Sequence, residues 1–421
     1  MKTLKFSKVG ENMNYEPLNK LYYCKSKDEY QSECFARRDG ELSVRLPIDI
    51  KGNQAFYVPA PEIYDTIIEI YKTDKKISRI ADHLPGVAVS QFAIKSLIGE
   101  IVLTNNIEGV HSTRREIQMT LDNIESTGKR DRFFGLVKKY EMLSKDKLTL
   151  VHCEDIRSIY DELVLDEVVS ENENNRPDGR IFRKNSVSVD NEFQREIHRG
   201  IFPEGKIIDT METALEFLND SSKPLLIRIS VFHYLFGYIH PFYEGNGRTS
   251  RFISSYLLST EFEPLIGYRL SYTIKENISK YYNAFKICND EKNFGDITPF
   301  IIIFLNIVKI SFEQLYKALE ERQQKLEYYE NRIGLLVSSK KTKKEAQKDT
   351  TIIHLLLQAG LFSESGISMC DLMKYSETSR TTVKNRIDEL GEKDLVITKT
   401  HKGNSKYYLL DLEKFDSIIS K

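Results

Sequence analysis

The chain has 421 residues, which is too long for one ordinary hydrophobic core and favours two or three domains. Its 61 basic and 62 acidic residues leave a net charge of −1, so no overall field points to nucleic acid or to a membrane surface. Any such partner has to be identified from local patterns. The five cysteines are scattered without a C-x-x-C pair, which fits a reducing compartment rather than a disulfide framework.

Neither secretion nor membrane insertion is indicated. The first residues, MKTLKFSKVGENMNY, contain no apolar stretch of signal-peptide length. The longest apolar run, PFIIIFLNIVKI at 299–310, is interrupted by Asn306 and Lys309 and is too short to span a bilayer. We therefore expect a cytoplasmic protein with no membrane partner.

Residues 1–90 are interpreted as an N-terminal module whose fold is left open. Short alternating pieces such as ELSVRL are mixed there with turn residues, among them Pro47 and Gly52. From residue 91 to residue 335 helical spacing dominates, and we predict a mainly α-helical core. One stretch interrupts it at 179–190, GRIFRKNSVSVD, where Lys-Asn-Ser stands between two short β-favouring pieces and predicts a β-hairpin.

The first helix of this core is predicted over residues 91–109. Its apolar residues recur at the spacing of a buried helix face: Ile94, Leu97, Ile98 and Ile101. Thr104 and Glu108 continue that stripe, and Gly109 is suited to end the helix. A carboxylate on the apolar side of a helix needs a cation, so we expect an arginine opposite Glu108. The alternative is a solvated glutamate at a frayed helix end.

The segment HPFYEGNGRTSR, at 240–251, follows an apolar run from Pro224 to Ile239 that predicts a buried helix. Helical spacing returns in RTSRFISSYLL, so Gly245-Asn246-Gly247 would turn the chain into a second helix. The first amides of that helix lack partners within it and attract anions. Arg248 and Arg251 lie on one face near its start, and both can only donate hydrogen bonds. These residues describe a cradle for a polyphosphate.

Two further residues of this segment can do chemistry. Glu244 offers a hard oxygen ligand of the kind that Mg²⁺ uses, and His240 can accept a proton near neutral pH. Beside the cradle, they indicate transfer chemistry on a nucleotide, with a hydroxyl as the attacking group. Phe242 is interpreted as an apolar anchor of the loop. Taken singly, the same residues have ordinary explanations, namely a structural histidine, a turn and a solvated helix face.

Taken together, the segment resembles the signature of the Fic family, H-x-F-x-(D/E)-G-N-G-R-x-x-R. Its fixed positions are met by His240, Phe242, Glu244, Gly245, Asn246, Gly247, Arg248 and Arg251. The resemblance implies transfer of AMP from ATP to a hydroxyl side chain, Ser, Thr or Tyr, of a target protein. A phosphorylating branch of the family, Doc, has a lysine where this chain has Gly247, which favours AMP transfer here.

The resemblance also implies a role for each residue of the signature. His240 would be the base and Glu244 the ligand of Mg²⁺. Asn246 and the amides of Gly245 and Gly247 would hold the α- and β-phosphates. The clamps on the β- and γ-phosphates would be Arg248 and Arg251.

Other segments extend the resemblance. KYYNAFKICND is similar to the segment that closes the adenine pocket, which implies adenine contacts for Tyr282 and Asn289, with a core position as the alternative for Tyr282. TNNIEG resembles the family's inhibitory helix, (S/T)-x-x-x-E-(G/N), which implies that Glu108 pairs with Arg251 in the γ-phosphate position. The hairpin at 179–190 corresponds to the flap that pairs with the main chain of the target.

Residues 336–349 are interpreted as an exposed linker, and residues 350–421 as a winged helix-turn-helix with its wing turn at Lys402-Gly403-Asn404. Basic residues gather on the presumed recognition helix and around the wing: Arg380, Lys384, Arg386, Lys399, Lys402 and Lys406. Four acidic residues nearly balance them: Asp388, Glu389, Glu392 and Asp394. DNA binding and protein docking both stay open.

We thus predict a mainly α-helical, auto-inhibited protein adenylyltransferase that uses ATP and Mg²⁺ and modifies a target protein, with self-modification left open. Two alternatives use the same core: a DNA-binding regulator that only senses nucleotide, and an enzyme that mainly removes AMP. The intact His240 and Glu244 argue against pure sensing, because sensing needs the cradle but not the base. The target protein, the direction of the reaction and a homo-oligomeric state are not decided by the sequence.

Overall fold

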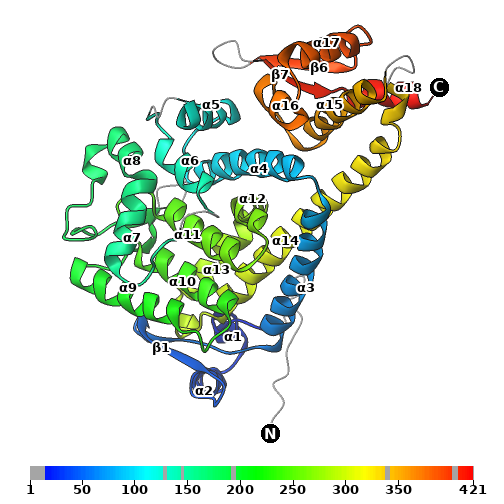
Figure 1. The fold of residues 1–421 in the computed structure, drawn as a ribbon. Helices are drawn as coiled ribbons and strands as arrows, with labels where there is room; N and C mark the ends of the chain where they lie inside the picture. Colours follow the sequence, from blue (N-terminus) through cyan, green and yellow to red (C-terminus); the bar gives the residue numbers. More distant parts are fainter. Residues whose placement is uncertain are drawn as a thin grey trace. The chain divides into compact units, whose positions relative to one another are not determined.

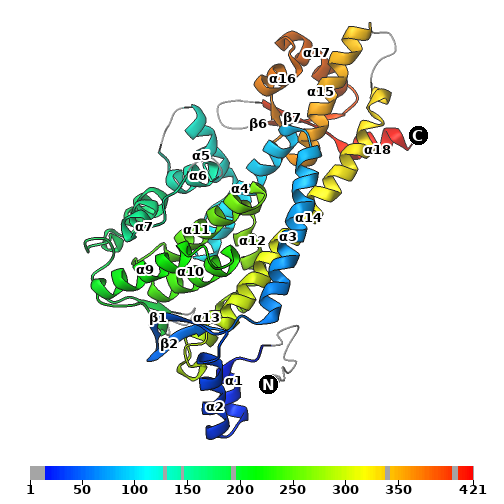
Figure 2. The same cartoon turned by 60° about the horizontal axis from the view of Figure 1, so that its bottom comes forward.

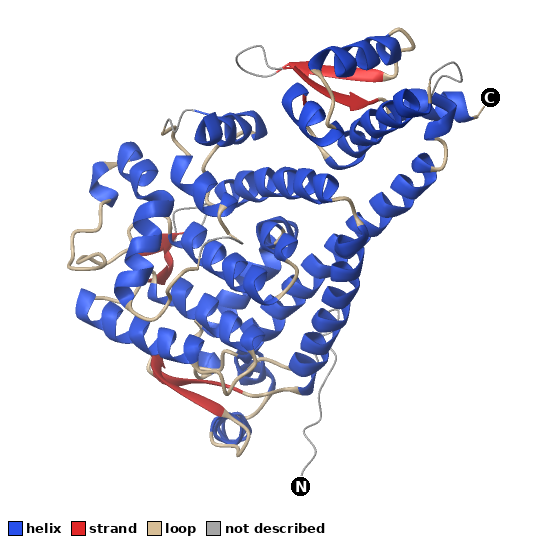
Figure 3. Ribbon diagram, in the orientation of Figure 1, coloured by secondary structure: helices blue, strands red, loops and turns tan. Residues whose placement is uncertain are grey.

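The computed structural model describes residues 15–126, 130–143, 147–190, 196–336, 342–400 and 406–420. Helices dominate it and the strands are short (Figure 3), so the predicted mainly α fold is confirmed. The chain divides into two compact units, residues 1–74 with 100–313 and residues 75–99 with 314–421. Three long helices contribute residues to both units: α3 (Pro61–His83), α4 (Gly86–Ile107) and α14 (Thr298–Glu330). The linear domain boundaries drawn from the sequence stay predictions.

The first unit holds most of the elements. It begins with α1 (Leu18–Cys24), α2 (Lys27–Arg38), β1 (Val44–Ile50) and β2 (Asn53–Tyr57). After α4 come α5 (Arg114–Ser126), α6 (Phe134–Glu141), α7 (Cys153–Tyr160), the π-helical turn η1 (Asp161–Leu165) and α8 (Asp166–Glu171). A second hairpin, β3 (Ser188–Asp190) with β4 (Glu196–Arg199), precedes α9 (Glu204–Asn219), α10 (Leu225–Ile239), α11 (Asn246–Glu261), α12 (Leu270–Glu276) and α13 (Ile278–Cys288).

Within residues 15–60, the first part of the predicted N-terminal module, helices α1 and α2 lie beside the β1–β2 hairpin (Figure 2). The hairpin turns at Lys51 and Gly52, whose φ angles of 53° and 85° suit a tight two-residue turn. Pro47, which the sequence suggested as a turn, lies inside β1 instead, where the register shifts between Arg45 and Asp49. A proline cannot donate to the strand ladder, and such irregularities accommodate it.

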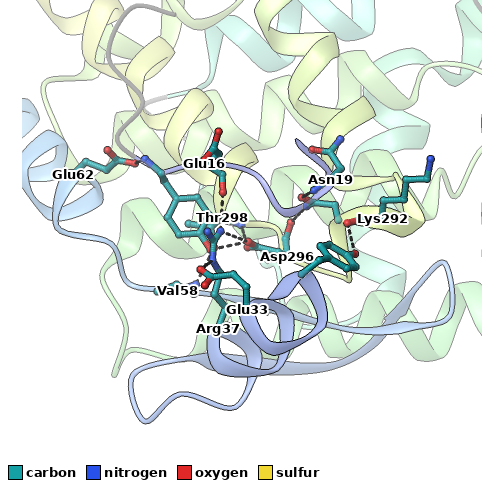
Figure 4. Close-up of polar contacts among 12 residues, drawn as sticks. Glu16, Asn19, Glu33, Arg37, Val58, Glu62, Lys292, Asp296 and Thr298 are labelled. Carbon is teal, nitrogen blue, oxygen red and sulfur yellow. Dashed lines mark hydrogen bonds and ion pairs between the residues drawn. The ribbon is translucent and has the colours of Figure 1, made fainter. Parts of the chain in front are cut away.

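Polar contacts join this module to the loop between α13 and α14 (Figure 4). The buried carboxylate of Asp296 accepts a hydrogen bond from the Tyr15 hydroxyl at 2.6 Å and lies 3.9 Å from the Arg37 guanidinium. Burial raises the pKa of Asp296. Strand β2 continues the contact through its main chain, because Phe56 donates to Gly295. The module is therefore built onto the helical core directly after α13.

Helix α10 is the centre of the first unit, with α9 and α11 packed on it (Figure 1). Twelve of its fifteen residues are buried, so the buried helix predicted from Pro224 to Ile239 is confirmed. A helix that is apolar nearly all round cannot lie at a surface. The segment after α10 therefore starts from a rigid and fully packed base.

The second hairpin lies later in the chain than its sequence pattern suggested. Strands β3 and β4 pair antiparallel, with Ser188 opposite Arg199, so the predicted turn at Lys-Asn-Ser, residues 184–186, is wrong. Polar contacts with neighbouring residues explain the difference. The amide of Lys184 donates to Asp178, and the amide of Asn185 donates to the Tyr243 hydroxyl at 3.1 Å. Lys184 is thus held by Asp178, and Asn185 is held by the segment after α10. Residues 191–195 lie outside the described part of the chain.

The second unit ends in a small helical and stranded region. It comprises α15 (Lys343–Phe362), β5 (Ile367–Ser368), α16 (Met369–Ser376), α17 (Arg380–Gly391), β6 (Val396–Thr400), β7 (Lys406–Leu410) and α18 (Leu412–Ile419). The three strands form an antiparallel sheet in the order β5-β7-β6. Helix α15 begins within the predicted linker, because Thr342 and Glu345 form a capping box at its start. The Lys402-Gly403-Asn404 turn lies outside the described residues.

Among the described residues, two helices, α4 and α14, are long and apolar enough to cross a membrane by length and composition alone. In the most apolar 18-residue stretch of α14, 67% of the residues are buried inside the structure. That burial is typical of a core helix, and it gives the apolar run at 299–310 a structural explanation.

Candidate active site

The HPFYEGNGRTSR segment forms a tight connection between α10 and α11. His240 ends α10 in the left-handed conformation, with φ 52° and ψ 64°, and its amide still donates to the carbonyl of Phe236 at 2.9 Å. Pro241 comes next, and a proline disfavours helical geometry in the residue before it. Gly245, with φ 82°, is the residue that starts α11. The loop thus places His240 and Glu244 at the junction of two buried helices.

Two residues hold this loop in place. The buried ring of Phe242 stacks on Tyr160 with centroids 3.6 Å apart and planes 10° apart, which confirms its interpretation as an anchor. The side chain of Asn246 accepts from the Phe242 amide at 2.9 Å and donates to the Phe242 carbonyl at 2.8 Å. Asn246 therefore shapes the loop, and its contact with phosphate stays a prediction.

Arg183 ties the loop to the hairpin, and the sequence did not reveal it. Its guanidinium is fully buried and donates to main-chain oxygens: Nε to His240 at 2.9 Å, Nη2 to Ile201 at 2.9 Å and Nη1 to Asn185 at 2.5 Å. Burial lowers the pKa of Arg183 to about 10. The peptide group that carries the His240 side chain is thus held directly by a buried cation.

The imidazole of His240 is neutral at physiological pH. Burial, together with the nearby His198 and Arg183, lowers the pKa of His240 to about 4. A neutral ring has a lone pair that can accept a proton, whereas an imidazolium has none. His240 is therefore in the state that a general base requires.

Glu244 is a partly buried carboxylate without a cation. It accepts the amide of Gly245 at 3.2 Å, and within the described part of the chain it forms no ion pair. Burial raises the pKa of Glu244, since the charged form is poorly solvated there. An unpaired carboxylate at the mouth of an anion cradle has the chemistry of a ligand for a hard divalent cation.

The start of α11 has the polarity that attracts an anion. The N-cap residue of α11, Gly245, has no side chain that could cap the first turn, and no acidic residue lies within that turn. The amides that begin a helix of this length carry the positive end of its dipole. Arg248 and Arg251 project from the same turn and are both buried.

Arg251 is fully engaged by the end of α4. Its Nε donates to the Thr104 hydroxyl at 2.8 Å, Nη2 donates to the Thr104 carbonyl at 3.0 Å, and Nη1 donates to the Glu108 carboxylate at 2.7 Å. The predicted arginine partner of Glu108 is confirmed. Gly247 makes this approach possible, because a Cβ atom there would lie 2.2 Å from Glu108 Oε1.

Arg248 is engaged much less. Its Nη1 donates to Glu167 of α8 at 2.6 Å, and both side chains are buried. Its Nε and Nη2 have no hydrogen-bond partner among the described residues. Buried donors without a partner are costly, so these two nitrogens call for an acceptor such as a phosphate oxygen.

Residues 150–258 match the family model described as the Fic/DOC family. The chain carries a Fic domain. Three curated proteins named protein adenylyltransferase Fic are similar to parts of it. That of Drosophila ananassae is 33% identical over 129 residues, 30% of this chain and 22% of the relative. Those of Drosophila virilis and Drosophila melanogaster are 42% identical over 69 residues, 16% of this chain and 12% of each relative. The chain thus spans less than a quarter of their length.

Solved structures of related proteins give a looser likeness. A Fic family protein from Desulfovibrio desulfuricans has a TM-score of 0.48 at 19% identity, over 84% of this chain and 97% of that one. Fic-1 of C. elegans has a TM-score of 0.42 at 17% identity, over 61% of this chain and 74% of that one. The matched Fic domain contains His240, Glu244, Arg248 and Arg251, whereas Glu108 lies outside it.

The two residues predicted to contact adenine also lie beyond the matched Fic domain, on α13. Tyr282 is 50% exposed, so the alternative core position is wrong. Burial raises the pKa of Tyr282, and so does the nearby Glu108 carboxylate. Tyr282 therefore lies near the Glu108–Arg251 pair. Asn289 accepts a hydrogen bond from the Tyr234 hydroxyl at 2.8 Å at the end of α13. Seven residues separate the two, about two helical turns, so they share one face; their adenine contacts stay predictions.

Two residues lie elsewhere than the sequence suggested. Helix α4 runs from Gly86 to Ile107, and Ile94, expected on its buried face, is 38% exposed. Gly109, with φ 74°, ends the helical segment as expected.

In α17, Arg386 was counted with the basic surface, but it is buried and donates to Glu389 at 2.7 Å and to the Leu336 carbonyl at 2.8 Å.

Proposed function

We propose that this chain is an auto-inhibited protein adenylyltransferase, which transfers AMP from ATP to a serine, threonine or tyrosine hydroxyl of a target protein. The observation that carries the proposal is the start of α11, where two donor nitrogens of Arg248 are buried without partners among the described residues, in the same short segment as the neutral His240. Sequence similarity to proteins named protein adenylyltransferase Fic supports the same activity.

The reaction needs a base within hydrogen-bond reach of the target's attacking hydroxyl. The target's hydroxyl oxygen forms a bond to the α-phosphorus, the bond from that phosphorus to the oxygen bridging to the β-phosphate breaks, and pyrophosphate leaves. The hydroxyl proton passes to the neutral ring of His240. Arg183 holds the His240 carbonyl, so the ring is presented from a fixed main chain.

Glu244 is the residue that would hold Mg²⁺. Its carboxylate is partly buried and forms no ion pair within the described residues, which fits a cation ligand. When bound, the ion would neutralise charge on the phosphates. Arg248 would contribute donors to phosphate oxygens through its Nε and Nη2.

Auto-inhibition follows from a conflict over Arg251. All three nitrogens of its guanidinium donate to Thr104 or Glu108. A γ-phosphate can use this arginine only after Glu108 withdraws. Because Arg251 is buried and its partner is only partly exposed, the pair is partly shielded from water, and we expect it to weaken productive ATP binding by roughly tenfold or more.

Labelled ATP tests the activity directly. Full-length protein, a Glu108→Gly variant and a Glu108→Gly/His240→Ala variant are incubated with a cell lysate and ATP labelled on either the α- or the γ-phosphate. The proposal predicts label on protein from the α position, strongest for Glu108→Gly and absent from the double variant. Label transferred from the γ position would show a kinase and refute the proposal.

For the C-terminal region we propose a winged helix-turn-helix that docks a protein partner. Three helices, α15 to α17, precede strands β6 and β7. With Arg386 buried, the exposed basic residues of α17 are Arg380 and Lys384, beside the exposed acidic Asp388 and Glu389. This balance favours protein over DNA, which requires clear positive potential. Binding of a generic DNA duplex at low salt, lost in Arg380→Ala/Lys384→Ala, would overturn this choice.

A further inference from the structure

Helix α11 presents two arginines one turn apart, and a glutamate from another helix reaches each of them. Glu108 reaches Arg251, and Glu167 reaches Arg248. The two arginines differ in how many of their guanidinium nitrogens donate a hydrogen bond. Arg251 has hydrogen bonds on Nε, Nη1 and Nη2, whereas Arg248 has one on Nη1 alone. The second glutamate therefore leaves most of its arginine available.

Glu167 lies on a helix that packs against the motif loop, residues 240–245 between α10 and α11. It lies in α8, which continues α7 through the π-helical turn η1. Such a turn inserts a residue and rotates the helix beyond it, and it occurs often at functional sites. A Cβ atom on Gly245 would lie 2.9 Å from Val164 and 3.2 Å from the Tyr160 ring, so this helix wall touches the loop closely.

The Glu167–Arg248 pair is shielded from solvent. The exposed fraction of the Glu167 side chain is 3%, and that of Arg248 is 0%. Arg132 lies 3.8 Å from the second oxygen of Glu167, so the carboxylate stands between two cations. Burial raises the pKa of Glu167, while the charge of Arg248 opposes that change. Removal of the carboxylate would leave a buried guanidinium with no acceptor among the described residues.

We infer that Glu167 is a positioning residue that holds Arg248 by one nitrogen, Nη1, and directs the N–H groups of its two free nitrogens, Nε and Nη2, toward the anionic oxygens of the nucleotide. The inference rests on the proposed function, namely that the start of α11 binds ATP. Glu167 and phosphate use different donors of Arg248, so both are bound at once. Glu108 and phosphate compete for the same donors of Arg251.

Nucleotides of different length separate positioning from general structural support. Dissociation constants for ATP and for AMP are measured by calorimetry on full-length protein carrying Glu108→Gly, so that the Arg251 pair does not mask the effect. Glu167→Gln is added to this background, with Asp166→Asn as the matched control. Asp166 is the preceding residue of α8, and its side chain is exposed. Thermal unfolding without nucleotide is recorded for each variant.

We expect Glu167→Gln to weaken ATP binding by about tenfold, because Arg248 loses its fixed orientation. AMP lacks the β- and γ-phosphates that Arg248 serves, so its binding should stay unchanged. Glu167→Asp keeps the charge and should recover part of the ATP affinity. Asp166→Asn should bind both nucleotides as its parent does. If Glu167→Gln does not fold, Glu167→Asp carries the comparison, with a smaller loss for ATP alone.

Three results would overturn the inference. Equal losses for ATP and AMP would make Glu167 a structural residue only, and unchanged affinities would deny it any role. Activation of an otherwise unmodified chain by Glu167→Gln, to the level of Glu108→Gly, would make it a second lock. The proposed function fails separately, namely when the Glu108→Gly parent binds no ATP or transfers label from the γ-phosphate instead of the α-phosphate.

Discussion

The two glutamates that face α11 differ in how firmly the structure holds them. Glu108 lies just beyond the last turn of α4, beside Gly109, and 22% of its side chain is exposed. Glu167 lies within a continuous helix packed on the motif loop, and 3% of its side chain is exposed. A group that has to leave must have few contacts, and a group that has to stay must have many. The comparison separates a releasable lock from a fixed support.

The largest expected effect concerns His240, whose main chain is held in place by Arg183. His240→Ala in the Glu108→Gly background should lower the rate of AMP transfer at least about a hundredfold, since a positioned base contributes on that scale. ATP affinity should stay close to that of the parent, because the cradle is intact. The rate is followed with α-labelled ATP and the affinity by calorimetry. Undiminished transfer would remove His240 from the mechanism.

Substitution of Glu108 should change the rate of AMP transfer in the opposite direction. Glu108→Gly should raise AMP transfer by roughly tenfold or more, because Arg251 becomes free for the γ-phosphate. Self-labelling and lysate labelling from α-labelled ATP measure the gain over a range of ATP and Mg²⁺ concentrations. A rate no higher than that of the unmodified protein would make the pair a structural one.

A third variant probes how the base is held. Arg183→Lys keeps a cation but loses the fork that binds the carbonyls of His240 and Ile201. We expect kcat to fall by about tenfold with little change in KM for ATP, since a small displacement of the base slows the chemical step. A change confined to KM would place Arg183 in nucleotide binding instead.

The smallest expected effect is a flat pH profile. The pKa of His240 in the folded chain is about 4, below the value of about 6.5 for an unfolded histidine. The base is therefore already neutral at pH 6, and kcat of the Glu108→Gly variant should not change between pH 6 and pH 8. For the same reason the stability linked to His240 is present above the unfolded pKa and is lost as pH falls from about 6.5 toward 4. A kcat that halves near pH 6.5 would contradict this environment.

Some of the site could be predicted from local spacing. The helix before His240, the turn at Gly245 and the anchoring of Phe242 depend on residues a few positions apart. An arginine partner for Glu108 was also predicted, because a carboxylate on an apolar stripe demands a cation, and the resemblance to the Fic family implied that this partner is Arg251. These features follow from the spacing of apolar residues along the chain, which can be seen in the sequence.

Other features depend on contacts that no spacing records. Glu167 is 81 residues from Arg248, and Arg183 is 57 residues from His240. Each side chain alone has the pattern of an ordinary charged surface residue. The hairpin was displaced for the same reason, since Asp178 and Tyr243 bind the residues that otherwise favour a turn. Long-range polar contacts decided these positions after local preference had left several choices.

The most direct test of the account is a double-mutant cycle on ATP affinity. Dissociation constants are measured for the unmodified chain, Glu108→Gly, Arg251→Ala and the double variant. If Glu108 acts by occupying Arg251, Glu108→Gly should tighten ATP binding by roughly tenfold in the presence of Arg251 and leave it unchanged in its absence. An equal gain from Glu108→Gly in both backgrounds would show that the glutamate acts without this arginine, and the central claim would be wrong.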